Sequence, residues 1–154
     1  MTARKKVALP AGALAILLVT LPAHEGVVYR VYRDPVGIAS YCMGETENPQ
    51  WGRKYTHTEC MAKLQDRLPE FYAGVKACVP GEMSDQRVAA FVSLAYNIGW
   101  AGFCKSSVAR LQNAGQFRAA CDAMLKFRFA KGIPLPGLTR RRNEERALCL
   151  KDLG

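Results

Sequence analysis

The sequence predicts an α+β domain in which helices predominate, and three observations support that fold class. The chain has 154 residues, of which 49% are hydrophobic and 23% are charged, the size and composition of one globular domain. Apolar residues recur at steps of three and four along most of it, which is the period of an amphipathic helix. Residues 36–45 instead combine glycines with Val, Ile and Tyr, a mixture typical of short strands joined by tight turns.

The first expected element is an uncharged apolar segment, residues 7–23, with the sequence VALPAGALAILLVTLPA. Three cations precede it, Arg4, Lys5 and Lys6. A basic start before an apolar run is typical of an export signal. As a helix, the segment spans about 26 Å, slightly less than the ~30 Å hydrocarbon core of a bilayer. Because Leu21 breaks the small-x-small rule for cleavage after Ala23, we expect a retained signal-anchor over residues 1–23. A cleaved signal peptide and a permanent anchor are the alternatives.

The segment after the apolar run is expected to remain helical before the hairpin begins. Residues 24–32 carry apolar side chains at helical spacing, so the first helix should continue to Tyr32. It should break before Asp34-Pro35, because the residue before a proline avoids the helical conformation. Strands and turns then follow over residues 36–45.

Helices are expected over the rest of the chain. Thr56 and Glu59 have the spacing of a capping box, which predicts the start of a helix. Its apolar face consists of Met61, Leu64, Leu68, Phe71 and Val75, with a kink at Pro69. Ser84 is a candidate N-cap for the next helix, which should end by Gly99. Further helices are expected over residues 105–113, 116–130 and 139–151, with a Gly/Pro-rich loop over residues 132–137.

The net charge of +9 favours an anionic partner, which could be nucleic acid, a membrane surface or an acidic wall polymer. No nucleic-acid-binding motif is present in the sequence, so a nucleic-acid partner is not expected. The cations Arg140, Arg141, Arg142 and Arg146 lie among acids in the last helix. We expect a solvated helix face with i,i+4 ion pairs there; attraction to an anionic wall is the alternative.

Six widely spaced cysteines, with no CxxC pair, indicate a disulfide framework in an oxidising compartment rather than a zinc site. Six buried thiols in a cytosolic protein are the alternative. Six cysteines allow 15 pairings. Sequence neighbourhood favours Cys42–Cys60 and Cys121–Cys149, which leaves Cys78–Cys104.

Two carboxyl groups, Glu25 and Asp34, are suited to acid–base chemistry. Glu25 follows the apolar run and Asp34 begins the expected hairpin, so we expect a protonated Glu25 and an ionised Asp34. Glycoside cleavage needs one carboxyl of each kind. Two solvated surface charges are the alternative.

The pattern Glu25-x8-Asp34-x5-Ser40 resembles the Glu-x8-Asp-x5-Thr signature of phage-type lysozymes, glycoside hydrolase family 24. The resemblance continues through residues 94–115 and 136–150. It implies a lysozyme-like fold with a small β-hairpin lobe and a helical lobe. It also implies a muramidase acting on peptidoglycan, with no metal or cofactor. By position, Glu25 is the general acid, Asp34 is the second carboxylate, and the Ser40 hydroxyl places the attacking water.

Two positions depart from the family pattern. Ser40 replaces the usual threonine, which keeps the hydroxyl but loses the methyl group that limits its rotamers. The usual Gly-His-Thr after the hairpin is Gly44-Glu45-Thr46. Glu45 is expected to be a surface charge; an acid that alters the pH dependence of the site is the alternative.

Family members with an uncleaved, weakly hydrophobic N-terminus are signal-arrest-release endolysins. That resemblance implies export by the host machinery and an inactive form tethered to the inner membrane through residues 7–23. A soluble, periplasmic, monomeric form with a catalytic domain over residues 24–154 would follow. No cysteine precedes Cys42, so thiol exchange with the anchor is not expected. A lytic transglycosylase and a non-catalytic, membrane-tethered wall-binding protein are the competing functions.

Overall fold

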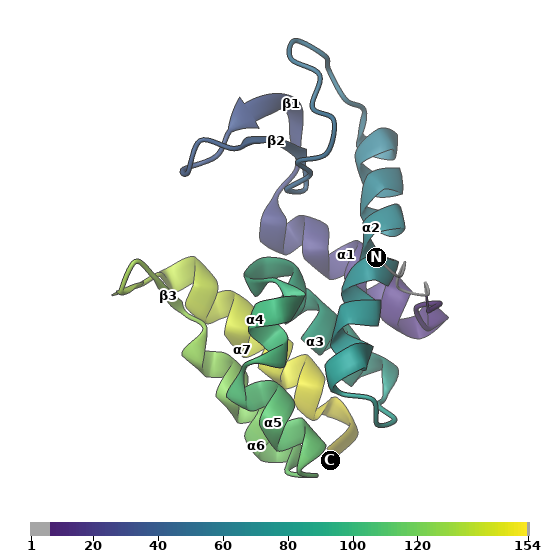
Figure 1. Ribbon diagram of the computed structural model, residues 1–154, viewed down its shortest axis with the longest axis vertical. Coiled ribbons are helices and arrows are strands. Elements are labelled where there is room, and N and C mark those ends of the chain that lie inside the picture. The colour runs from purple at the N-terminus through teal and green to yellow at the C-terminus, as the bar shows by residue number, and fades with distance from the viewer. Residues whose placement is uncertain (1–6, 154) are drawn as a thin grey trace. The chain divides into compact units, whose positions relative to one another are not determined.

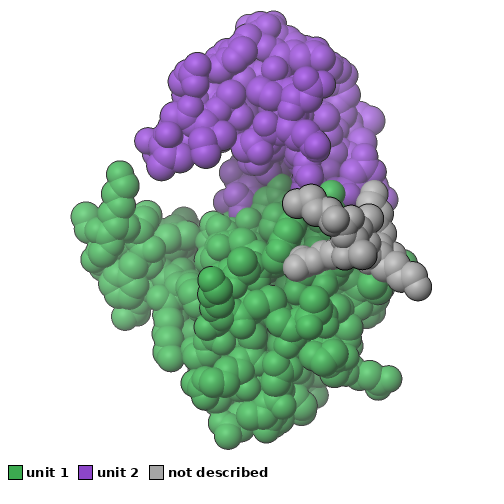
Figure 2. All heavy atoms as spheres, viewed as in Figure 1, with its two compact units in different colours: residues 1–16, 68–154 green, residues 17–67 purple. Residues whose placement is uncertain are grey.

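The computed structural model describes residues 7–153 (Figure 1); the expected basic start, Arg4 to Lys6, lies outside them. The chain divides into two compact units (Figure 2). We call residues 17–67 the hairpin unit, and residues 1–16 with 68–154 the helical unit. The division falls within α1 (Ala11–Glu25) and within α2 (His57–Cys78), so each helix contributes to both units.

Helix α1 passes position 23 without a break. Ala13, Leu17 and Leu21, at steps of four, are fully buried, whereas Val19 is 74% exposed. The helix ends after Glu25 because Gly26 adopts a positive φ of 71° and its N–H bonds to the Pro22 carbonyl at 3.0 Å, an αL helix terminus. Within the described residues, no helix combines the length and the apolar character needed to cross a membrane.

The expectation that the first helix continues to Tyr32 is wrong. Gly26 stops the helix, and β1 (Val28–Arg33) follows. Its sequence, VYRVYR, is rich in β-branched and aromatic residues, which favour strands. A hairpin forms, but it begins earlier than expected: β1 pairs antiparallel with β2 (Ala39–Cys42), with Tyr32 opposite Ser40 and an irregularity between Val28 and Tyr32. Only β2 lies within residues 36–45, where strands were expected.

Helix α2 begins as the capping box predicts, since the Thr56 hydroxyl accepts a hydrogen bond from the Glu59 N–H at 3.1 Å. Three of the five expected apolar-face residues, Leu64, Leu68 and Val75, are at most 1% exposed. Pro69 lies inside α2, at the position expected from the sequence.

The core of the helical unit forms around α3 (Asp85–Ile98). Ser84 caps this helix by accepting from the Arg87 N–H, as predicted, and every residue from Arg87 to Ala95 is buried. Helix α7 (Pro136–Leu150) makes its most extensive contacts with α3, and α5 (Ser107–Asn113) packs on α6 (Phe117–Ala123). The short helix α4 (Trp100–Cys104) was not expected from the sequence.

The expected helix over residues 116–130 is too long. Helix α6 ends at Ala123, a 3₁₀ turn spans Met124–Lys126, and β3 (Phe129–Ala130) pairs with β4 (Ile133–Pro134). Lys131 and Gly132 both have positive φ, the backbone of a two-residue type I′ hairpin turn. The expected loop over residues 132–137 is therefore partly a second hairpin.

Three disulfides fasten these elements, and they are the pairs that sequence neighbourhood favours. Cys42–Cys60 joins β2 to α2, Cys78–Cys104 joins the end of α2 to α4, and Cys121–Cys149 joins α6 to α7. Each contributes about 3 kcal/mol in the chain-entropy model.

Candidate active site

Glu25 is the last residue of α1 and is half-buried. It lies four residues after Leu21, so it continues the row of Ala13, Leu17 and Leu21 along one face of the helix. Gly26 ends the helix immediately after it. The packed face of α1 therefore sets the position from which the Glu25 side chain projects.

Asp34 is held by the backbone of the turn between β1 and β2. Its Oδ1 accepts hydrogen bonds from the Val36 N–H at 3.0 Å and the Ile38 N–H at 2.8 Å. Gly37 supplies the positive φ of 85° that closes the turn, and its N–H bonds to the Asp34 carbonyl at 2.9 Å. No residue in the described part of the chain donates to Asp34 Oδ2, so this oxygen is open to a water or a ligand.

Ser40 is 3% exposed and lies on β2. Its hydroxyl donates to the Ile38 carbonyl at 3.2 Å. The same carbonyl accepts from the Asp34 N–H at 2.9 Å. The backbone of Ile38 thus links Asp34 and Ser40, two of the three residues that the family pattern singles out.

Glu45 is not the surface charge that was expected. It is 5% exposed, and its Oε2 forms an ion pair with Arg67 Nη2 at 2.9 Å. The Glu45 backbone also exchanges both N–H···O bonds with Tyr41, each at 2.9 Å. Burial follows because this tight turn directs the carboxylate toward the cation on α2 rather than toward solvent.

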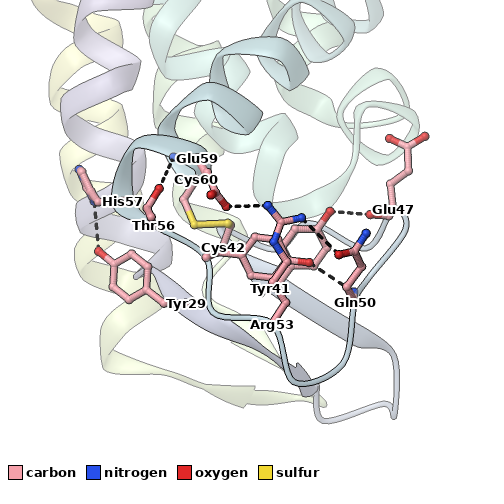
Figure 3. The surroundings of a disulfide bond; sticks show 11 residues. Tyr29, Tyr41, Cys42, Glu47, Gln50, Arg53, Thr56, His57, Glu59 and Cys60 are labelled. Atoms are coloured by element: carbon pink, nitrogen blue, oxygen red, sulfur yellow. Dashed lines mark hydrogen bonds and ion pairs between the residues drawn. A yellow bond between two sulfur atoms is a disulfide. The ribbon is translucent and has the colours of Figure 1, made fainter.

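Aromatic contacts fasten the same part of the hairpin unit (Figure 3). The ring of Tyr41 stacks on Tyr55, with centroids 4.4 Å apart, and its hydroxyl donates to the Glu47 carbonyl. Beside them, the Cys42–Cys60 disulfide joins β2 to the start of α2. Ser40 is therefore followed directly by a fixed segment.

In the helical unit, the expected solvated face of the last helix is wrong for two of its cations. Arg141 and Arg142 are 5% and 0% exposed. Arg142 forms an ion pair with buried Glu145 and donates to the Asn97 amide oxygen, while Arg141 donates to the Ser93 carbonyl at 3.0 Å. This face of α7 is buried because it packs on α3. The sequence carries no signal for this burial, because charged side chains are usually solvated.

No group of His, Cys, Asp and Glu side chains within residues 7–153 is arranged to hold a metal ion. The polar groups assembled near the hairpin are a carboxylate, a hydroxyl and backbone amides. Such a set can hold and polarise a water molecule.

The chain is similar to known proteins over most of its length. The family model for phage lysozyme matches residues 22–145. A SAR-endolysin from Enterobacteria phage P21 is 34% identical over 156 residues, which covers 96% of this chain and 94% of the relative.

Two solved structures are similar across most of the chain. The active form of the P1 phage endolysin Lyz has a TM-score of 0.78 at 25% identity and covers 92% of this chain and 85% of its own. A P22 lysozyme has a TM-score of 0.79 at 27% identity and covers 94% of this chain and 99% of its own. Both carry a fold like the one described above.

Proposed function

The chain belongs to the phage lysozyme family, and from that premise we propose how its residues cleave peptidoglycan. It is a glycoside hydrolase, an endolysin with muramidase activity. Its reaction is hydrolysis of the β-1,4 bond between N-acetylmuramic acid and N-acetylglucosamine in the bacterial wall.

Asp34 and Ser40 hold the attacking water. The observation that carries this assignment is the Ile38 backbone, which bonds to both residues. Asp34 Oδ1 is occupied by two backbone N–H donors, so Oδ2 is the atom that accepts a proton from water. The Ser40 hydroxyl then fixes the direction of that water, and the amides keep the carboxylate from rotating.

Glu25 is the general acid. It protonates the glycosidic oxygen while the water attacks the sugar from the opposite face, and Asp34 takes the proton that the water loses. Delivery of water from the opposite face inverts the anomeric carbon. The packed row that leads to Glu25 along α1 supports this role, because an acid must be held within a fraction of an ångström of its target.

A lytic transglycosylase needs only one acid and forms an anhydro sugar without water. It would leave the Asp34–Ser40 arrangement without a role. A wall-binding protein without activity would need neither carboxyl, and membership of a hydrolase family argues against it.

We also infer that residues 7–23 act first as a membrane tether and later as part of the folded enzyme. The SAR-endolysin relatives support this, as does the row Ala13, Leu17 and Leu21, which is fully buried in the folded chain. A helix inserted in a bilayer cannot bury the same row in the protein. Glu25, two residues beyond the segment, would then be displaced, so the tethered form is inactive. Export by the host machinery precedes both states, and the released form is a periplasmic monomer.

The test of the mechanism replaces Glu25 by glutamine, which removes the transferable proton and keeps the side-chain shape. We expect the kcat on purified peptidoglycan to fall at least about 100-fold, with binding to insoluble wall unchanged. Glu82→Gln, at an exposed carboxyl, is the matched control and should retain full activity.

Mass spectrometry of the released sugars separates the two enzyme reactions. Products with a free reducing end are expected, whereas anhydro products would establish a transglycosylase. Activity of Glu25→Gln within twofold of the parent would refute the assignment. The intact mass of the active periplasmic protein tests the tether, since loss of residues 1–23 would contradict it.

A further inference from the structure

One face of α2 contacts the segment that directly follows Ser40. Cys60, Lys63 and Arg67 lie on this face, because their steps of three and four residues match the helical period. Cys60 is bonded to Cys42, and Lys63 Nζ lies 5.3 Å from the centroid of the Tyr41 ring. The third contact is the ion pair of Arg67 with Glu45.

Arg67 joins two acids, Glu45, which closes the tight turn, and Glu47, which follows it. Its Nη2 lies 2.9 Å from Glu45 Oε2 and 2.8 Å from Glu47 Oε2. The two carboxylates differ in surroundings, since the Glu45 side chain is 4% exposed and that of Glu47 is 77% exposed. A buried carboxylate is costly without a cation, so the turn depends on Arg67 to keep Glu45 in place.

We propose that Arg67 is a positioning residue for Ser40, acting through Glu45. The disulfide fastens β2 to α2 at Cys42, in addition to the pairing of β2 with β1. The ion pair adds a second attachment to α2 three residues further on, in the turn that follows the strand. Together the two attachments hold the chain just beyond Ser40. This proposal rests on the role of Ser40 in holding water.

Ser40 stands where the family pattern has threonine, and this difference makes the positioning of its hydroxyl more important. Serine lacks the methyl group that restricts the χ1 rotamers of threonine. The direction of the Ser40 hydroxyl therefore depends more on its backbone and on the bond to the Ile38 carbonyl. The second attachment, just beyond the strand, compensates for the missing methyl group.

The test is a double-mutant cycle between Arg67 and Ser40, measured as kcat and KM on peptidoglycan. Arg67→Met removes the charge and keeps the apolar stem. It should lower the kcat about tenfold, with a smaller change in KM, because a shift of the catalytic group well below 1 Å has an effect of this size. In a Ser40→Ala background the same substitution should change the kcat less than about twofold, because the group being positioned is gone.

Three more variants keep the test decisive. Glu45→Gln breaks the ion pair from the other side and leaves no buried charge, so it should reproduce the loss in kcat even if Arg67→Met folds poorly. Ser40→Thr restores the methyl group and should reduce the effect of Arg67→Met. Arg53→Met removes a different Arg–Glu pair, Arg53 with Glu59, and should leave the kcat unchanged.

The outcomes separate this proposal from the proposed function. An equal loss in the native and Ser40→Ala backgrounds means that Arg67 acts independently of Ser40, which overturns the positioning role and leaves the muramidase mechanism intact. Full activity of Ser40→Ala overturns the role of Ser40 in the mechanism, and the positioning role with it.

Discussion

The candidate site and the buried charge network of α7 are built in opposite ways. Asp34 and Ser40 form their hydrogen bonds with groups two to four residues away in the sequence. In α7, Glu145 accepts a hydrogen bond from Ser93, 52 residues away, and Arg142 reaches Asn97, 45 residues away. The hydrogen bonds of Asp34 and Ser40 form within the hairpin, whereas the charge network forms only when α7 packs on α3.

This difference predicts that substitutions in one region change catalysis and that substitutions in the other change stability. A site held by local backbone bonds can lose a reacting group without losing its shape. A buried network of charges loses stability when any member is removed, because the others remain desolvated and unpaired. Substitutions in the two regions should therefore affect different measurements.

The largest expected effect is that of Asp34→Asn on catalysis. Asparagine keeps an oxygen that can accept from the Val36 and Ile38 N–H groups, so the turn should persist. It cannot take a proton from water, so the kcat should fall about 1,000-fold while the free energy of unfolding changes by less than about 1 kcal/mol. Kinetics on peptidoglycan and urea denaturation measure the two quantities. A loss of several kcal/mol in stability would show that the turn is not the self-contained unit described.

Arg142→Met should have the converse effect, a loss of about 3 kcal/mol in the free energy of unfolding, because Glu145 is left buried with one cation fewer. The kcat at a temperature where the variant is folded should be nearly unchanged. Arg140→Met, at an exposed position in the same helix, is the control and should change stability by less than about 0.5 kcal/mol. Equal effects of the two variants would contradict the buried network.

A smaller effect on stability is expected at alkaline pH, from a tyrosine that lies outside both regions. Burial, assisted by the negative charge of Asp85, raises the pKa of the Tyr72 hydroxyl above its ordinary value of 10.0. The folded state therefore holds this proton more tightly than the unfolded state does. Its contribution to stability is complete below pH 10 and declines as the pH rises toward the folded-state pKa.

Tyr72→Phe should make the stability of the protein less sensitive to pH above 10, as followed by thermal unfolding at several pH values. Absorbance at alkaline pH should show one fewer late-titrating tyrosine. An unchanged alkaline profile would mean that Tyr72 titrates alike in both states.

Several features were predictable because they depend on neighbours in sequence. The strand at β2 and the caps at Thr56 and Ser84 follow from short-range patterns. The three disulfides span 18, 26 and 28 residues, and they follow from the order of the cysteines in the sequence. The end of α1 also depends on a local signal, the glycine at position 26. The apolar spacing continues to Tyr32, however, and it led to the wrong prediction of a longer helix. The period alone could not distinguish a short strand from a continued helix.

Other features depend on contacts between distant segments. Nothing near Glu45 in the sequence indicates that it pairs with Arg67, 22 residues later, and nothing near Arg141 and Arg142 indicates that both are buried. A charged side chain is usually solvated. Without knowledge of a partner, the sequence therefore predicts that such a side chain is exposed.

The sequence by itself determined the family, and it supplied the residues proposed for the chemistry, because the Glu25, Asp34 and Ser40 pattern depends on local spacing alone. Tertiary structure alone decided which charges are buried, since burial depends on which helices pack together. It also decided what fixes Ser40: a cation seven residues beyond Cys60 can act on the hairpin only because one face of α2 lies against it.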